Sequence, residues 1–547
     1  MRNAPFFLAS ALLIGQFFNK VFTLGPESDF FAAFRYEGLL FFKNFMAGPD
    51  WRFLFIRDWS TSPSSIEHPL LYFRNLDVLH FLAGAVQYLL PKVGPWALVV
   101  AALLVSLGAA FLVWHELSDL LDRRVASVAL ASMLIVPQGL LAASLNLFLA
   151  VCLLSFSVMT VLSVRLLQGR PISRGWMGAL FVVGVINAGL ETNLAVYFAA
   201  VVGFCCLVRW LRRGRSGFGE FWKLTIILAL PILMVRGVQY GAVVHYGYSE
   251  LMKEDLQYSR MARISGNVDP VDAVQFFQKR GLNFFGMSER LSLSDLLEET
   301  NGVLKRNFGK TLPWIFLLVA ILTIRFRKRW DPSIIVPLYL FWMVSLVLFL
   351  MVPVTGNALL NLGLRDHAFI DFLLGARLCF YVSVFLVIQA AMELYWPKGR
   401  GVIPFVVVAL VMVQFRSAQS HNRKENFDFV ELLAKVPAGA DLVTNFEPSI
   451  SAVTTGARVN LSWFIEANES CKGLDGQGLL KMYRVGSSES ALSSPLYYYL
   501  VLTPPYLPEV ENPLQYALEK NCLNESNSVV VARTDKAFLI RRAGVEK

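Results

Sequence analysis

Charged residues are scarce in this 547-residue chain, which is 55% hydrophobic and only 16% charged, with a mean hydropathy of +0.52. Soluble globular proteins average about 25% charged residues, so this shortage argues against an ordinary soluble enzyme and predicts a polytopic membrane protein. No internal repeat is visible in the sequence, which argues against the transporter folds that are built from repeats.

Cysteine is also scarce, and the six cysteines have no metal-ligand spacing. Four of them lie in apolar runs, where burial explains them: Cys152, Cys205, Cys206 and Cys379. Cys471 and Cys522 lie in the polar C-terminal part and could pair if that part faces an oxidising compartment. The apolar N-terminus lacks a small-x-small cleavage site, so we expect an uncleaved first span rather than a signal peptide.

Long apolar runs dominate the first 416 residues. A helix needs about 20 mostly apolar residues to cross the hydrocarbon core of a bilayer. By this rule the sequence predicts about eleven transmembrane helices, near residues 5–24, 95–115, 125–143, 146–166, 176–191, 193–209, 222–238, 312–325, 333–354, 369–391 and 402–416.

Arginine-rich segments between these runs set the predicted orientation. RWLRRGR (209–215) and RFRKR (325–329) could suggest nucleic acid, but apolar spans flank them, so they indicate cytoplasmic loops and no nucleic-acid partner. The run at 70–91 is apolar, yet it carries Arg74, Asp77 and His80. If it spanned the membrane, the arginine-rich loops would fall outside. We therefore predict a helix along the interface there and a cytoplasmic N-terminus.

This topology predicts two domains. A transmembrane domain at 1–416 would carry a first outer loop at 25–94 and a long outer loop at 239–311. An extracytoplasmic α/β domain would follow at 417–547. Within it, FDFVELLAKVP predicts a helix, ADLVTN and SPLYYYLVLTPP predict strands, and NSVVVARTDKAFLIRRA predicts a hairpin that turns at TDK.

The first outer loop mixes phenylalanine with charge, as in GPESDFFAAFRYEGLLFFKNFM (25–46). Phe30, Phe34, Phe41 and Phe45 fall near one helical face, which is typical of helices that lie in the headgroup plane and present charges to a cavity at the outer surface. Asp29 at the head of this segment has two interpretations. It is either a helix N-cap or a general base that faces the cavity.

The stretch SDFFAAFRY, followed some thirty residues later by EHPLLYF, resembles the first outer loop of the GT-C superfamily of membrane glycosyltransferases. This superfamily includes the protein O-mannosyltransferases and the lipid A aminoarabinose transferases. The order of spans, long outer loop and C-terminal outer domain is also similar to theirs. The resemblance implies transfer of a sugar from a polyprenyl-phosphate donor to a glycan, lipid or protein acceptor at the outer face.

The resemblance also assigns roles to residues of the first outer loop. Asp29 matches the family's catalytic acidic position and would act as general base on the acceptor. His68 and Pro69 match the HPPL element of the family, with Leu70 where a second proline often stands. Glu67 has no firm counterpart, but it is a second carboxylate in the same loop and a second catalytic candidate.

Cations are needed for the departing lipid phosphate, and arginine suits this because its planar fork binds phosphate oxygens. Arg365 and His367 in GLRDHAF stand where relatives often carry basic residues, and Arg377 lies about three turns further along. Other interpretations stay open: an ion pair of Arg365 with Asp366, a snorkelling or structural role for Arg377, and a headgroup anchor for Arg35.

Two short outer connections complete the predicted site. Glu191 in INAGLETNLAVY either lines the cavity, as polar residues there do in relatives, or caps the next helix. Many relatives have an acidic residue after the third span, whereas AASLNLFL offers only Asn146. No metal ligands are therefore assigned, and a need for a divalent cation stays an open question.

The sequence thus predicts an inverting glycosyltransferase of the bacterial inner membrane, with its C-terminal domain in the periplasm. A non-enzyme alternative is a component that flips or exports lipid-linked glycans, which should carry charges inside the bundle core. A glycan polymerase or ligase is a further alternative, because the outer loop at 239–311 holds several basic residues: Arg260, Arg263, Lys279, Arg280 and Arg290.

Overall fold

The structure is a computed structural model of the 547-residue chain. It describes residues 3–23, 32–47, 57–58, 71–72, 78–121, 123–135, 143–190, 192–214, 218–250, 252–253, 430–437, 440–444, 458–461, 497–502, 528–534 and 537–542. The chain divides into two compact units. We call residues 1–27, 95–238 and 291–424 the helical unit, and residues 28–94, 239–290 and 425–547 the mixed unit.

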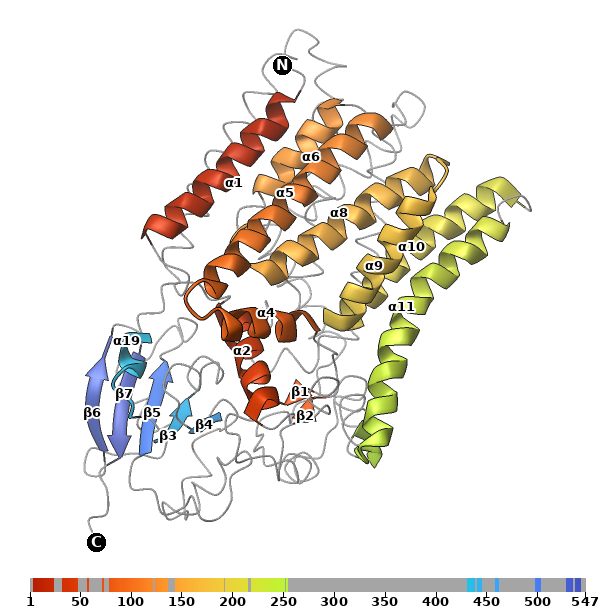
Figure 1. The fold of residues 1–547 in the computed structure, drawn as a ribbon. Helices are drawn as coiled ribbons and strands as arrows, with labels where there is room; N and C mark the ends of the chain where they lie inside the picture. Colours follow the sequence, from red (N-terminus) through yellow and green to blue (C-terminus); the bar gives the residue numbers. More distant parts are fainter. Residues whose placement is uncertain are drawn as a thin grey trace, which may run out of the picture. The chain divides into compact units, whose positions relative to one another are not determined.

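Long apolar helices make up the described part of the helical unit, where they lie side by side (Figure 1). They are α1 (Ala4–Thr23), α5 (Gly94–Leu120), α6 (Arg123–Ile135), α8 (Leu147–Leu167), α9 (Arg174–Leu190), α10 (Thr192–Arg213) and α11 (Phe218–His245), the last of which ends in the mixed unit. Within the described residues, four segments are long and apolar enough to cross a membrane: Gly94–Leu120, Leu147–Leu167, Leu194–Leu211 and Phe218–His245.

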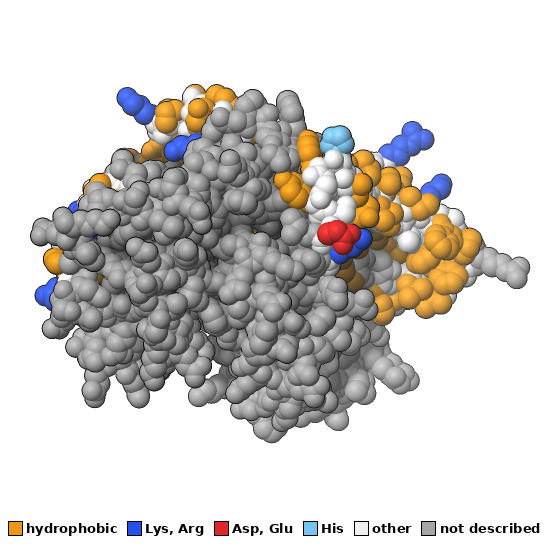
Figure 2. Space-filling model, turned by 90° about the horizontal axis from the view of Figure 1, so that it is seen from below, with side chains coloured by type: hydrophobic (Ala, Val, Ile, Leu, Met, Phe, Trp, Pro, Cys, Tyr) orange, Lys and Arg blue, Asp and Glu red, His pale blue; other side chains and the backbone are white. Residues whose placement is uncertain are grey.

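These helices overlap the first seven predicted spans. The four predicted spans at 312–325, 333–354, 369–391 and 402–416 lie outside the described residues, so the total of eleven stays a prediction. The described apolar surface fits a lipid environment, because α11 exposes Ile226, Leu233 and Met234 among other large apolar side chains. Exposed hydrophobic side chains also prevail among the described residues visible in Figure 2.

Helix α8 is the central element of the helical unit and is buried along most of its length. It carries small polar residues that bond to their own helix, since Ser157 and Thr160 donate to the carbonyls of Leu153 and Phe156 at 2.8 Å. It ends at Gly169, whose φ of +74° closes a Schellman turn in which the N–H of Arg170 donates to the carbonyl of Arg165 at 2.9 Å. A polar helix interior is tolerated here because the backbone satisfies it.

Helices α9 and α11 approach closely at Gly184. A Cβ atom at this position would lie 2.9 Å from Cγ of Pro231, so only glycine fits without a shift of its neighbour. Helix α11 has 28 residues, which corresponds to a length of about 42 Å. This exceeds the hydrocarbon core of about 30 Å. Its last residues, Gln239–His245, accordingly belong to the mixed unit.

The mixed unit begins with two packed helices, α2 (Ala32–Ala47) and α4 (Val78–Leu89). The predicted helix at 70–91 is wrong at its start, because Leu71–Tyr72 form a short strand β2 that pairs antiparallel with β1 (Arg57–Asp58). The helix begins only at Val78, and its 12 residues span about 18 Å. That length is too short to cross a bilayer and agrees with the predicted interfacial position.

The C-terminal part folds as a five-stranded sheet in the order β4-β3-β5-β7-β6. The strands are β3 (Asp441–Thr444), β4 (Arg458–Leu461), β5 (Tyr497–Leu502), β6 (Ser528–Arg533) and β7 (Ala537–Arg542). β3 pairs in parallel with β4 and β5, whereas β7 pairs antiparallel with β5 and β6. The short helix α19 (Val430–Leu433) packs against β7.

The predicted strands and hairpin of this part are confirmed. The β6–β7 turn at TDK closes through a 2.9 Å hydrogen bond from the N–H of Thr534 to the carbonyl of Ala537. Leu433 of α19, Leu442 of β3 and Leu539 of β7 are among its buried side chains. Its boundary at 417 and its place as a separate outer domain stay predictions.

The cysteines agree with the sequence where they are described. Cys152, Cys205 and Cys206 are buried, as their apolar surroundings predict. Cys379, Cys471 and Cys522 lie outside the described residues, so pairing of the last two stays a prediction.

Candidate functional site

The predicted general base, Asp29, lies outside the described residues, between the end of α1 at Thr23 and the start of α2 at Ala32. It therefore precedes α2 by three positions in the chain. Arg35 lies in the first turn of α2, although its side chain is not described. The structure shows that α2 itself packs against α4.

Helix α2 is held against α4 by an unusually close crossing. A Cβ atom on Gly38 would overlap the carbonyl oxygen of His80, and one on Gly84 would overlap the carbonyl oxygen of Gly38. Only a pair of glycines lets the two backbones approach so closely. This crossing at Gly38 thus fixes α2, the helix that follows Asp29 in the chain.

Aromatic side chains fill the remaining contact between these helices. Phe41 is 6% exposed, with its ring 6.3 Å from that of His80, and Phe42 and Phe45 lie 5.2 and 5.4 Å from Phe81. The sequence predicted that the phenylalanine face of this helix would lie in lipid. At Phe41, this face packs against α4 instead. Helix α4 instead exposes apolar residues, Val78, Leu82 and Leu89, along a surface suited to the membrane interface.

Glu67 and His68 also lie outside the described residues. The chain on either side of them is described, because β1 and β2 pair with Arg57 opposite Tyr72 and Asp58 opposite Leu71. The strand pair closes the loop that carries both predicted residues. Their distance from Asp29 stays open.

Glu191 is outside the described residues as well, but its two neighbours end α9 at Leu190 and start α10 at Thr192. This confirms the predicted short connection. One turn earlier in α9, Asn187 is fully buried and its Nδ2 donates to Oγ of Ser155 on α8 at 2.7 Å. The ring of Tyr197 on α10 lies edge-on to Phe156 of α8 at 6.0 Å. Buried contacts thus fix both helices that flank Glu191.

Asn146 has a structural role. Its Oδ1 accepts a 3.1 Å hydrogen bond from the N–H of Leu149 and so caps the N-terminus of α8. An N-cap satisfies one of the backbone donors that a helix start leaves without a partner. The position where relatives often carry an acidic residue therefore serves helix formation here. Arg365, His367 and Arg377 lie outside the described residues.

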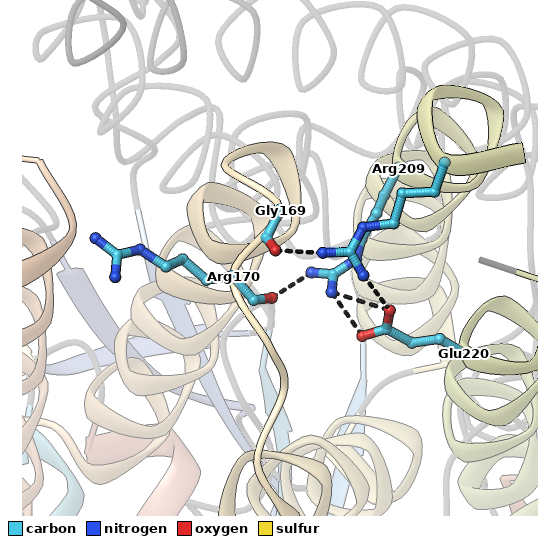
Figure 3. Close-up of polar contacts among 5 residues, drawn as sticks. Gly169, Arg170, Arg209 and Glu220 are labelled. Atoms are coloured by element: carbon cyan, nitrogen blue, oxygen red, sulfur yellow. Dashed lines mark hydrogen bonds and ion pairs between the residues drawn. The ribbon is translucent and has the colours of Figure 1, made fainter. Parts of the chain in front are cut away.

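A polar cluster that sequence reasoning missed joins α8, α10 and α11 (Figure 3). Both carboxylate oxygens of Glu220 accept from Nη2 of Arg209, at 2.7 and 2.9 Å, and one also accepts from Arg213 at 3.0 Å. Arg209 further donates to the carbonyl of Arg170, and Arg213 donates to the carbonyl of Gly169 at 2.5 Å. We call these five residues the arginine clamp.

The clamp gives part of the arginine-rich segment 209–215 a structural role. The side chain of Arg209 is only 5% exposed, and such a buried charge needs a partner. The sequence signal was Glu220, an acidic residue shortly after a block of arginines, but a sequence alone does not tell which arginine it meets.

A second ion pair lies at the ends of neighbouring helices. Arg165 on α8 donates from two nitrogens to Glu116 on α5, and its guanidinium lies 5.0 Å from the ring centroid of Trp176 on α9. Nε2 of Gln168 donates to the carbonyl of Leu120 at 2.5 Å. These contacts join three helices at the ends expected to face the cytoplasm.

The described ranges contain no group of three or more His, Cys, Asp or Glu that could hold a metal ion. Asp29 and Glu67 lie outside those ranges, so the question of a divalent cation stays open.

The sequence matches no protein-family model and no curated protein. Among solved structures, the chain is similar to ArnT from Cupriavidus metallidurans bound to undecaprenyl phosphate, with a TM-score of 0.52 and 13% identity over 98% of both chains. It is also matched to the oligosaccharyltransferase AglB from Archaeoglobus fulgidus, with a TM-score of 0.47 and 11% identity over 92% of this chain and 69% of that chain. ArnT and AglB are both membrane glycosyltransferases of the GT-C superfamily.

The chain shares its fold with ArnT. The likeness to ArnT covers nearly the whole of both chains, so it includes the helical membrane part as well as the C-terminal part. The predicted resemblance is thereby confirmed at the level of the fold. At this identity a shared fold does not by itself establish a shared reaction, which has to be argued from the site.

Proposed function

We propose that this chain is a membrane glycosyltransferase that moves a sugar from a polyprenyl-phosphate donor to an acceptor at the outer face of the membrane. The observation that carries the proposal is the likeness to ArnT along the whole chain, together with the ArnT structure's own ligand, undecaprenyl phosphate. Asp29 and His68 also stand at positions that match the family's first outer loop, and Glu67 is a second carboxylate in the same loop.

The proposed chemistry is a direct displacement at the anomeric carbon. The acceptor oxygen or nitrogen forms a bond to that carbon while the bond from carbon to the phosphate oxygen breaks, with inversion. Asp29 takes the proton from the acceptor, and polyprenyl phosphate leaves with the bonding electrons. Arg365 and Arg377 are the proposed partners of the leaving phosphate, because guanidinium groups bind phosphate oxygens in pairs and keep their charge.

The packing of α2 supports Asp29 as the base. A general base has to be held within hydrogen-bond reach of the proton that it removes. Asp29 lies three positions before a helix whose backbone packs closely against α4 at Gly38 and Gly84. Arg35, at the start of the same helix, is proposed to contact the donor or the acceptor, with His68 and Glu191 as further lining residues.

A flippase receives less support from the structure. Such a protein should hold charges inside its bundle. Among the described residues, however, Arg209 is the only Asp, Glu, Lys or Arg that is buried. It lies near the end of α10 and is neutralised by Glu220. A polymerase or ligase would use the same kind of donor, so the acceptor would distinguish it.

The test is release of polyprenyl phosphate from a panel of radiolabelled polyprenyl-phosphate sugars, with native membrane extract as the source of acceptor. We expect acceptor-dependent release by the wild type and a loss of at least 100-fold in Asp29→Asn, since general-base catalysis contributes about 10²–10⁴-fold. Asp119→Asn is the matched control, because Asp119 is an exposed carboxylate near the end of α5.

Other outcomes would redirect the assignment. Release that is unchanged in Asp29→Asn would remove Asp29 as the base and leave Glu67 as the candidate. If the folded wild type turned over no donor with any acceptor, the transferase proposal would fail and the flippase would become the better explanation.

A further inference from the structure

The end of the helical unit that holds the arginine clamp also carries an exposed aromatic cluster. Four rings from α10 and α11 contact one another: Trp210 stacks on Phe221 with ring centroids 5.3 Å apart, and Trp222 meets Phe218 and Phe221 edge to face at 6.0 and 5.8 Å. Phe218 and Trp222 are 51% and 48% exposed. Large aromatic rings at the end of a transmembrane helix are typical of headgroup depth in a membrane.

The charges beside these rings are predominantly positive. Glu220, the carboxylate of the clamp, is already bound by Arg209 and Arg213. Arg213 keeps 40% of its side chain exposed, and Arg170 and Lys223 are exposed on either side of it in the chain. Figure 3 shows the side chain of Arg170 pointing away from Glu220, so its guanidinium is not used by the clamp. Four cations and one carboxylate leave this cluster with three net positive charges.

The clamp also orders the backbone beside these cations. Arg209 fixes the backbone of Arg170 through its carbonyl, and Gly169 is fixed in the same way by Arg213. The turn after α8 is therefore joined to α10 and, through Glu220, to α11. A surface whose charges are already positioned binds a ligand at a lower entropic cost.

We propose that this surface binds the headgroup of an anionic phospholipid. The phosphate diester would lie against Arg213, and Arg170 and Lys223 would add to the positive potential around it, while Phe218 and Trp222 would contact the glycerol and the upper acyl chains. The two parts fit one ligand, because a lipid presents a negative phosphate directly above an apolar chain, which a soluble anion does not. The proposal does not depend on the transferase reaction.

The experiment uses the full chain, purified in detergent and titrated with phosphatidylglycerol or phosphatidylcholine that carry the same acyl chains. Lipid binding is counted by native mass spectrometry, and the thermal unfolding midpoint is followed in parallel. We expect phosphatidylglycerol to bind more tightly, to raise the midpoint, and to lose both effects at high salt.

The decisive variant is Arg170→Gln with Lys223→Gln, which leaves Arg209, Arg213 and Glu220 intact. Each cation near an anionic membrane surface contributes about fivefold in affinity, so we expect a loss of about 25-fold. The matched control is Lys435→Gln with Arg533→Gln, which removes two exposed cations from the C-terminal part and should bind as the wild type does.

Three results would overturn the proposal. They are equal binding of phosphatidylglycerol and phosphatidylcholine, wild-type affinity in the Arg170→Gln/Lys223→Gln variant, and an equal loss in the control variant. Inorganic phosphate at millimolar concentration provides a further arm. If it raised the midpoint as much as the lipid does, the surface would be a site for a soluble anion instead.

Discussion

At the scale of single residues, the arginine clamp shows why a charge can be buried at the end of a membrane helix. Burying a guanidinium is costly unless a carboxylate and further acceptors surround it. Arg209 meets this condition through both oxygens of Glu220 and the carbonyl of Arg170. The ion pair thus joins α10 to α11 and to the turn that follows α8.

We predict that Glu220→Gln destabilises the protein more than a typical surface substitution does. The change leaves the buried charge of Arg209 without its partner, so the expected loss is about 3 kcal/mol in the free energy of unfolding. Thermal and denaturant unfolding of the detergent-purified chain would measure it. Glu250→Gln is the control, because Glu250 pairs with Lys253 at 2.7 Å where both side chains are at least 67% exposed. An exposed pair contributes about 0–1 kcal/mol, so equal losses in the two variants would contradict the interpretation of the clamp.

At the scale of secondary-structure elements, α2 and α4 are the pair that matters most for the proposed reaction. Their crossing is set by Gly38 and Gly84, and their aromatic side chains pack around it. The sequence shows that both segments are apolar, but the amphipathic pattern alone did not tell which face of α2 meets another helix. Phe41 faces α4 because Gly84 lets that helix approach α2 closely.

We predict that Gly84→Ala lowers both stability and transferase activity. The added methyl group would overlap the backbone of Gly38 and force the helices apart, at a cost of about 1–3 kcal/mol, as for other overpacked sites. Activity should fall as well, since α2 follows Asp29 by three positions. Thermal unfolding and polyprenyl-phosphate release would measure the two effects.

Gly108→Ala is the matched control for this substitution. Gly108 lies in the interior of α5, and a Cβ atom there would have no neighbour within 4 Å. Alanine should therefore be tolerated at this position. Wild-type activity and stability in Gly84→Ala would show that the close crossing is not needed.

At the scale of the whole molecule, the described helices of the helical unit alternate in direction. This alternation determines which of their turns would lie on the same side of a membrane. Helix α8 leads to Gly169, α9 begins at Arg174, and the turn between α10 and α11 follows Arg213. These turns carry the arginine residues that the positive-inside rule places in the cytoplasm. Helix α11 then runs about 42 Å from Phe218 to His245, long enough to cross the bilayer.

We predict that Arg174→Cys and Glu250→Cys face opposite sides of the membrane. Both positions are exposed, one at the start of α9 and the other after α11. In a background without other cysteines, a membrane-impermeant maleimide should label Glu250→Cys in intact spheroplasts. Arg174→Cys should be labelled only after the membrane is opened. Labelling of both from the same side would refute the proposed topology.

The sequence by itself predicted the long apolar helices of the helical unit and the strands β3, β5, β6 and β7 of the C-terminal sheet, but not β4. The predicted features depend on the length and period of apolar runs and on local signals such as the turn at TDK. Only the tertiary structure decided that Arg209 meets Glu220, that Phe41 faces α4, and that α4 begins at Val78 rather than near residue 70. Each of these depends on a partner distant in the chain or on a strand pairing across a loop, and the pattern of a single segment does not carry that information.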